Sequence, residues 1–191
     1  SDELVEMGED PMDPGGYFII HGTEKTLMTL EDLAPNRILV SRDKDTGLVQ
    51  GKVFSTRAGF RGRCTCDRTR EGRLSITLPS YGKALELILV LRALGLDKNE
   101  KILSVFSDAP QVRNDILLNV EAEDAKNKRE ALETIGKRAA PGQPVDYQLK
   151  RAQLLLDRYL LPHIGVEESA RLPKAFFLCR MAERTILVAN K

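Results

Sequence analysis

The sequence predicts an α+β fold: an antiparallel, β-rich N-terminal half of about five to seven short strands, packed with an α-helical C-terminal half of about five to six helices. Two observations predict it. Up to Gly82, short runs that alternate apolar and polar residues stand between turn residues, which is typical of antiparallel strands. From Lys83 onward, apolar residues recur at helical spacing. Strands followed by helices favour this class over a doubly wound fold.

The chain begins with an acidic segment and a predicted hairpin. Residues 1–13 contain six carboxylates and no Lys or Arg, so we expect a flexible extension there. Strand formers at 17–20 and a second extended run at 26–30 predict two paired strands. The expected turn and hinge positions are a proline, three glycines and a histidine: Pro14, Gly15, Gly16, His21 and Gly22.

Further strands are predicted in the first half wherever the alternation resumes. Their ranges are 37–42, 49–56, 63–69 and 73–78. Within 49–56, successive side chains point to opposite faces of a sheet. Four residues therefore share one face: Val49, Gly51, Val53 and Ser55.

The second half is predicted to be helical. The expected helices are 83–94, 97–107, 108–120, 121–138, 145–159 and 174–189. Gly95 is a natural stop for the first, and Asp97 and Asp108 are predicted to cap the next two. The segment 121–138 is heavily charged, with Ala131, Leu132 and Ile135 as its core stripe, which predicts an exposed helix.

Composition excludes several classes of protein. The 29 basic and 28 acidic residues leave a formal charge of +1, which argues against a chain that is basic as a whole. Three cysteines give no disulfide framework and favour a reducing compartment, so we expect a cytoplasmic protein. No membrane span and no secretory signal are predicted. Because the chain lacks an initiator Met and stops directly after an apolar helical run, we expect it to be part of a longer protein.

The acidic and cysteine motifs do not predict chemistry. Asp43-Lys44-Asp45 has a spacing used for magnesium, but it lies in a turn without a third carboxylate and is expected to be a solvated hairpin tip. Cys64 and Cys66 lie on one strand face without a second ligand pair, so half-buried thiols are expected rather than a metal site.

The remaining motifs are weak. Gly59-Phe60-Arg61-Gly62 matches a nucleic-acid clamp that needs flanking helices, and strands flank it here. His163 follows Pro162 at a helix end, where a capping role is expected. No catalytic residue and no metal ligand is predicted, since no phosphate loop, nucleophile elbow or zinc motif occurs.

One basic cluster stands out. Six arginines against two carboxylates between residues 57 and 73 give a local charge of +4. Guanidinium groups suit phosphate, so the cluster predicts DNA-phosphate contact, while a merely solvated strand face stays open as the alternative. The arginines are Arg57, Arg61, Arg63, Arg68, Arg70 and Arg73.

Five segments carry a resemblance to a known family. Residues 13–25, Asp-Pro-Gly-Gly-Tyr-Phe-Ile-Ile-His-Gly-Thr-Glu-Lys, resemble a Gly-Gly-Tyr-Phe-Ile-Ile-Asn-Gly-(Ser/Thr)-Glu-Lys element of the second-largest (beta/B-type) subunit of multisubunit DNA-directed RNA polymerases. The family also has counterparts of Leu-Val-Leu-Arg-Ala-Leu-Gly at 89–95, Thr-Ile-Gly-Lys-Arg at 134–138, Tyr-Leu-Leu-Pro-His-Ile at 159–164 and Lys-Ala-Phe-Phe-Leu at 174–178. The match looks most like the archaeal members of the family, in their split B″ half. His21 departs from the family's usual Asn.

The resemblance implies a fold position and a role. By it, 14–36 is a hairpin at the junction of the protrusion and lobe domains, and 37–191 is the lobe domain. The lobe would form one wall of the DNA cleft and guide downstream double-stranded DNA in transcription. The complex would be a nucleotidyltransferase whose catalytic residues, Mg²⁺ and Zn²⁺ lie outside this chain.

The resemblance leaves an alternative open. The chain could serve mainly as a protein-interaction platform, with the charged helix 121–138 and the following loop docking transcription factors or other polymerase subunits. A free-standing nucleotide-binding enzyme is disfavoured because no phosphate cradle is present.

Overall fold

The computed structural model describes residues 2–44, 46–79 and 81–190. The contacts within the chain separate it into two compact units, one ending at Leu33 and the other beginning at Ala34. Each unit is described by itself.

The first unit contains a short helix and a two-stranded sheet. Helix α1 (Asp2–Glu6) lies in the acidic segment, and β1 (Tyr17–Ile20) pairs antiparallel with β2 (Thr23–Thr26). His21 and Gly22 have φ values of 51° and 74°, as a tight two-residue hairpin turn requires. This turn closes the hairpin at once, so the second strand predicted at 26–30 is wrong, and pairing begins at Thr23.

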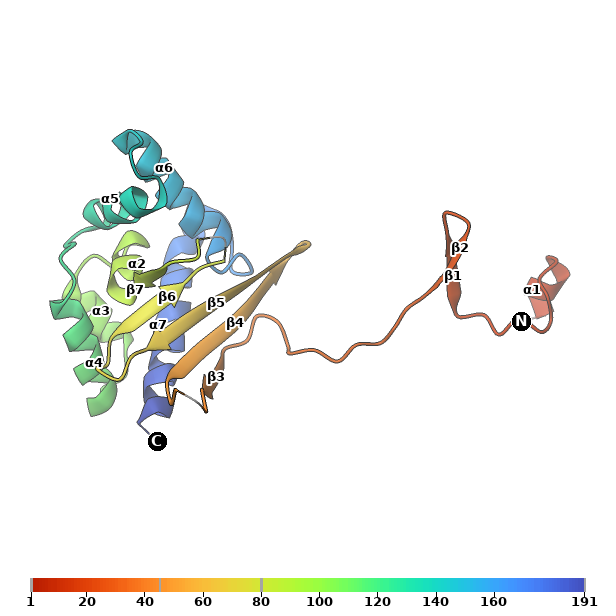
Figure 1. Ribbon diagram of the computed structural model, residues 1–191, viewed down its shortest axis with the longest axis horizontal. Helices are drawn as coiled ribbons and strands as arrows, with labels where there is room; N and C mark the ends of the chain where they lie inside the picture. The colour runs from red at the N-terminus through yellow and green to blue at the C-terminus, as the bar shows by residue number, and fades with distance from the viewer. Residues whose placement is uncertain (1, 45, 80, 191) are drawn as a thin grey trace. The chain divides into compact units, whose positions relative to one another are not determined.

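The second unit is built on a five-stranded antiparallel meander (Figure 1). In order across the sheet, its strands are β3 (Leu39–Arg42), β4 (Val49–Arg57), β5 (Phe60–Arg68), β6 (Leu74–Thr77) and β7 (Ala84–Glu86). The mixed class, with strands in the first half of the chain and helices in the second, confirms the predicted α+β fold.

The predicted starts of β5 and of the first long helix are wrong. Strand β5 begins at Phe60 rather than at residue 63, because Ala58 and Gly59, at φ values of 41° and 81°, form a two-residue turn. The predicted helix at 83–94 begins only at Leu87, since Ala84–Glu86 pairs with β6. A three-residue strand is too short to show a period, so its single buried Leu85 fits a helix pattern equally well.

The helices follow in chain order. They are α2 (Leu87–Ala93), α3 (Asn99–Val105), α4 (Pro110–Glu121), α5 (Lys128–Ala139), α6 (Val145–Leu154), a π-helical turn η1 (Leu155–Tyr159), a 3₁₀ turn η2 (Glu168–Ala170) and α7 (Arg171–Ala189). The predicted caps Asp97 and Asp108 are wrong: α3 and α4 start one residue later, after Lys98 and Ala109, without a side-chain cap.

The predicted helix 121–138 is two elements. Helix α4 ends at Glu121, and α5 begins at Lys128 behind Asn127, whose side-chain oxygen accepts a hydrogen bond from the Glu130 backbone N–H. Glu130 in turn accepts from the Asn127 side chain, so this helix start has reciprocal capping. The predicted stripe at 131, 132 and 135 is buried as expected.

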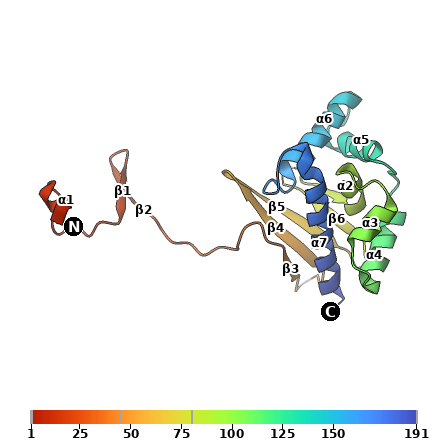
Figure 2. The same ribbon diagram turned by 180° about the vertical axis from the view of Figure 1, so that it is seen from behind.

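Helix α7 covers one face of the sheet. Figure 2 shows it crossing β3, β4 and β5, which it contacts. The predicted face of β4 is the buried one, and a side chain at Gly51 would place its Cβ 2.6 Å from Thr185 Oγ1 and 3.3 Å from Met181 Cγ. The absence of a side chain at Gly51 therefore allows α7 to lie close against the sheet.

A buried lysine anchors the start of α7. Lys174 has no exposed surface, and its ammonium donates to the backbone oxygens of Leu156 at 2.9 Å and Asp157 at 2.7 Å. Those oxygens lie in η1, where the π-helical turn changes the usual backbone pairing. Arg171 adds a two-pronged ion pair to the Asp157 carboxylate, at 2.8 and 2.7 Å. Together the two cations hold η1 against α7.

Replacing Lys174 with Met tests this anchor. We expect the free energy of unfolding to fall by about 2–3 kcal/mol at pH 7, because two buried carbonyl oxygens lose their donor. Burial lowers the pKa of Lys174 from 10.5 to about 8, so between these values the unfolded chain holds a proton that the folded chain has released. The wild-type chain should therefore gain stability from pH 8 to 10 relative to Lys174→Met. Urea denaturation across this range measures it. The anchor would be contradicted if the free energy of unfolding changed with pH equally in wild type and Lys174→Met. It would also be contradicted if the exposed control Lys137→Met lost as much stability as Lys174→Met.

Candidate nucleic-acid interface

The six predicted arginines do not converge on one surface. Arg61 and Arg68 are seven residues apart on β5, which at strand rise is roughly 23 Å. Their side chains also leave opposite faces of the sheet, because an odd spacing along a strand reverses direction. The structure therefore separates the cluster into distinct groups.

One group lies on the face of the sheet opposite α7. We name it the outer-face patch, and it consists of Lys52, Phe54, Arg61 and Arg63. Phe54 pairs in register with Arg63, and Thr56 pairs with Arg61. The Arg61 guanidinium carbon lies 5.2 Å from the centre of the Phe54 ring, which is cation–π distance. Three cationic side chains and one aromatic ring thus lie together on a partly exposed face of the sheet.

Sequence reasoning missed Lys52 in this patch. The signal was available, because the buried alternation of β4 leaves Lys52 and Phe54 on the opposite face. What the sequence lacked was the register with β5, which brings these two residues beside Arg61 and Arg63.

Arg57 ends β4 on the other face. Its Nη1 donates weakly to the Pro162 backbone oxygen at 3.5 Å, and its Nη2 lies 4.0 Å from Glu167. Both side chains of this ion pair are largely exposed, so it contributes little stability.

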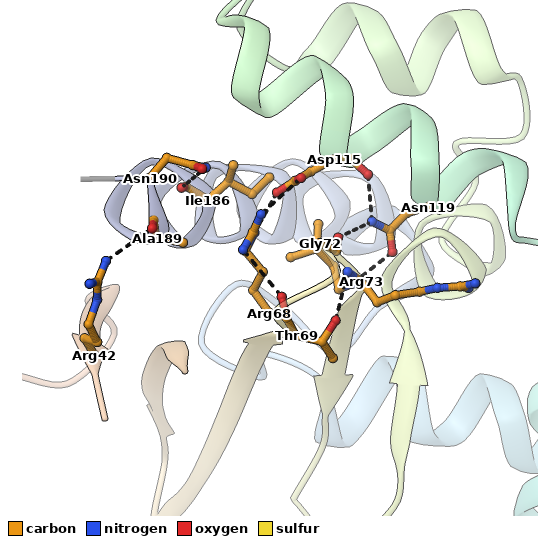
Figure 3. Close-up of polar contacts among 11 residues, drawn as sticks. Arg42, Arg68, Thr69, Gly72, Arg73, Asp115, Asn119, Ile186, Ala189 and Asn190 are labelled. Carbon is orange, nitrogen blue, oxygen red and sulfur yellow. Dashed lines mark hydrogen bonds and ion pairs between the residues drawn. The ribbon is translucent and has the colours of Figure 1, made fainter. Parts of the chain in front are cut away.

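Arg68 is part of the core. Its Nε and Nη2 donate to the two oxygens of Asp115 on α4 at 2.6 and 3.2 Å, and both side chains are mostly buried. Asn119, one turn further along α4, accepts from the Leu74 backbone N–H and donates to the Gly72 oxygen. Figure 3 shows this network joining α4 to the turn between β5 and β6. The guanidinium of Arg68 is thus already paired with Asp115 of the same unit.

Arg70 and Arg73 diverge from each other. Arg70 Nη2 donates to the Thr46 backbone oxygen at 3.1 Å, across the turn that precedes β4. The Arg73 backbone N–H donates to Thr69 Oγ1, and in Figure 3 its side chain extends away from Arg68. The two therefore cannot serve one ligand.

The expected helix-end role of His163 is wrong. Its Nδ1 is 2.8 Å from Ser55 Oγ, and its backbone N–H donates to the same oxygen at 3.1 Å, while its ring packs edge-on against Phe177. Burial lowers the pKa of His163, and the charge of Lys174 lowers it further, so the ring is neutral at pH 7. His163 ties its loop to β4 instead of supplying a cation to a helix end.

The cysteines are more deeply buried than expected. Cys64, Cys66 and Cys179 are free thiols, and each is at most 1% exposed rather than half-buried, because α7 seals this face of the sheet. Burial raises the pKa of Cys64 and of Cys179 to about 12. Thiols in this state are unreactive and poor metal ligands at neutral pH.

The other motifs occupy turns. Gly59 lies in the tight turn between β4 and β5 and Gly62 within β5, so no helix flanks the Gly-x-x-Gly motif. Asp43 begins the turn before β4 and is exposed, whereas Asp45 lies outside the described residues. Within the described residues, no three His, Cys, Asp or Glu side chains gather as a metal site, and no helix is long and apolar enough to span a membrane.

The chain matches the family model described as RNA polymerase Rpb2, domain 2, over residues 34–191. This range is the whole second unit. The chain belongs to this family. The family resemblance that five short segments predicted is confirmed.

Archaeal relatives extend the match to the first unit. The chain is 48% identical over 188 residues to DNA-directed RNA polymerase subunit Rpo2N of Halobacterium salinarum, covering 95% of this chain and 36% of the relative. It is 44% identical over 191 residues to Rpo2N of Methanocaldococcus jannaschii, covering 97% and 38%. For subunit Rpo2 of Saccharolobus solfataricus the values are 37% over 188 residues, 97% and 17%.

The coverages show that this chain is short against its relatives. It spans about a third of the length of the Rpo2N proteins. The Saccharolobus protein is about twice as long as these, since the same stretch fills 17% of it and 36% of the halobacterial one.

The family's segments have structural roles in the second unit. Arg138, in the 134–138 segment, forms a two-pronged ion pair with Glu86 of β7, at 2.6 and 3.3 Å. His163 and Lys174 make the buried contacts described above. Three of the five segments that carried the resemblance thus hold elements of the second unit together.

Removing the partner of Arg68 tests its place in the core. Asp115→Asn should lower the free energy of unfolding by about 3 kcal/mol, because it leaves a largely buried guanidinium without a counter-charge. The matched control is Asp108→Asn, which breaks an exposed pair with Arg113 of α4 and should have no measurable effect. Denaturant titration at pH 7 gives both values. Equal effects would show that Arg68 is not paired as described.

Proposed function

We propose that this chain is the lobe domain of the second-largest (B-type) polypeptide of an archaeal RNA polymerase, forming one wall of the DNA cleft and guiding downstream double-stranded DNA. Membership of the Rpb2 domain 2 family supports the placement in a polymerase. The single observation that carries the DNA contact is the outer-face patch. It offers Lys52, Arg61 and Arg63 on the sheet face that α7 leaves uncovered.

The chemistry of the patch suits a duplex held without sequence reading. Guanidinium and ammonium groups bind phosphate oxygens regardless of base, and such contacts position DNA rather than specify it. A near-neutral chain with one local basic face gives weak, salt-sensitive binding. That behaviour suits a cleft wall past which DNA must move.

In this proposal the chain contributes no catalytic group. The assembled polymerase transfers nucleotides, its Mg²⁺ and Zn²⁺ lie outside this chain, and the other polymerase subunits are the partners. The buried thiols of the second unit and the pairing of Arg68 with Asp115 support a positioning role for these groups.

Neutralising the patch tests the proposal. A reconstituted archaeal polymerase carrying Arg61→Ala and Arg63→Ala should bind duplex DNA more weakly at low salt. The slope of log affinity against log salt should shrink by about 2, because each lost phosphate contact removes roughly 0.9. Equilibrium binding at several salt concentrations measures the slope.

The control for this experiment is Arg113→Ala with Arg129→Ala. It removes the same charge from exposed positions on α4 and α5. An outer-face variant that behaves like this control would contradict DNA contact by the patch.

A second candidate function is docking of an initiation or elongation factor. Leu172 and Phe176 lie one turn apart on α7, and each is 45% exposed; Phe176 lines a groove of about 460 Å³. Apolar surface of this kind is commonly covered by another protein. We expect Leu172→Ser with Phe176→Ser to abolish retention of such a factor on immobilised polymerase without changing DNA affinity. Unchanged retention would contradict it.

A further inference from the structure

We propose that the second unit contains a binding site for a phosphoryl group at the C-terminal end of α7, separate from the outer-face patch. We name it the guanidinium pocket. It is a cavity of about 220 Å³ between the start of β4, the β5–β6 turn and the last turn of α7. Its described lining residues are Arg42, Gly47, Leu48, Val49, Arg68, Thr69, Arg70 and Ala189.

Three arginines from different elements meet at this cavity. Arg42 ends β3, Arg68 ends β5, and Arg70 lies in the turn that follows. Among the described lining residues none is acidic. Guanidinium groups around one small cavity repel one another wherever no carboxylate compensates them, and an anion between them offsets this repulsion.

The hydrogen-bond partner of each guanidinium group determines whether its positive charge is compensated. Arg68 is paired with Asp115, so its charge is compensated. Arg42 donates from Nη2 to the backbone oxygens of Val188 and Ala189 at 3.1 and 3.2 Å, and Figure 3 shows it beside Ala189. Arg70 donates from Nη2 to the neutral Thr46 oxygen.

Carbonyl anchors fix these two side chains without cancelling their charge. The end of α7 contributes only about half a negative charge through its dipole. Within the described part of the chain, Arg42 and Arg70 have no carboxylate at ion-pair distance, and their Nε and Nη1 groups make no hydrogen bond. Counted over the described residues, the cavity therefore keeps more than one positive charge and four nitrogen groups that can donate.

Phosphoryl oxygens fit this donor set. Guanidinium groups bind phosphate in forked geometry, and charge-assisted hydrogen bonds of this type are among the strongest in proteins. The Thr69 hydroxyl accepts from the Arg73 backbone N–H and keeps its own proton for donation. A neutral ligand would leave the charge uncompensated, which favours a dianionic phosphate or the phosphodiester of a nucleic acid.

The pocket can be tested without DNA. The 191-residue chain is titrated calorimetrically with inorganic phosphate, and in a second arm with a short DNA duplex. The variant Arg42→Gln with Arg70→Gln keeps two polar side chains and removes both uncompensated charges. The control Arg113→Gln with Arg129→Gln removes the same net charge from exposed sites on α4 and α5.

We expect phosphate binding that weakens at least about tenfold in the pocket variant and is unchanged in the control. If only duplex binding depends on the pocket, the phosphoryl group belongs to nucleic acid, which also supports the proposal. Absence of phosphate and duplex binding, or equal losses in both variants, overturns it. Circular dichroism melting of the pocket variant, expected to match wild type, separates lost binding from unfolding.

This outcome is independent of the outer-face patch. Arg61 and Arg63 lie on the other face of the sheet, roughly 20 Å along β5. Polymerase carrying the outer-face substitutions should keep pocket-dependent binding, so one proposal can fail while the other stands.

Discussion

The second unit depends on how closely α7 approaches the sheet. Gly51 provides room for Thr185 and Met181, and the inner face of β4 and β5 then closes over Cys64 and Cys66. Any side chain at Gly51 would have to push the helix away, which would open a large apolar contact in the unit. The buried ammonium of Lys174 fixes the start of the same helix to η1, and the neutral ring of His163, in the loop that follows η1, packs against Phe177 of the helix. Apolar packing and polar contacts thus both fix the position of α7.

Much of this arrangement could be predicted from periodicity. The alternation in β4 correctly gave its buried face, and the apolar stripe at 131, 132 and 135 gave the packed side of α5. Prediction failed where local signals are ambiguous. Three residues of β7 cannot display a period, and Asp97 and Asp108 stand outside the helices they were expected to cap. Asn127 with Glu130 had the capping pattern and was overlooked inside a long charged run.

The candidate sites were less predictable because they depend on register and tertiary packing. Of six arginines near one another in sequence, Arg61 and Arg63 share an exposed sheet face, and Arg68 and Arg70 line a cavity at which Arg68 also forms a core ion pair. Arg57 and Arg73 belong to neither group. Arg42 enters the cavity from a strand outside the sequence cluster, and Lys52 joins the outer-face patch only through its pairing with β5. The density of charge in the sequence indicated the region. The direction of each side chain depends on its odd or even position along the strand and on which sheet face is covered by helices that come later in the chain.

The two faces of the β4–β5 hairpin differ in how strongly a substitution affects the packing of the core. Gly51, Val53 and Cys64 face α7, so a change at any of them requires matching changes in the helix. Their immediate neighbours in sequence, Lys52, Phe54 and Arg63, lie on the face opposite α7, so a change at these positions requires no matching change in the helix. Substitutions on the outer face of this hairpin can therefore change its surface charge at little cost in folding stability, whereas substitutions at every second residue between them disturb the packing of α7.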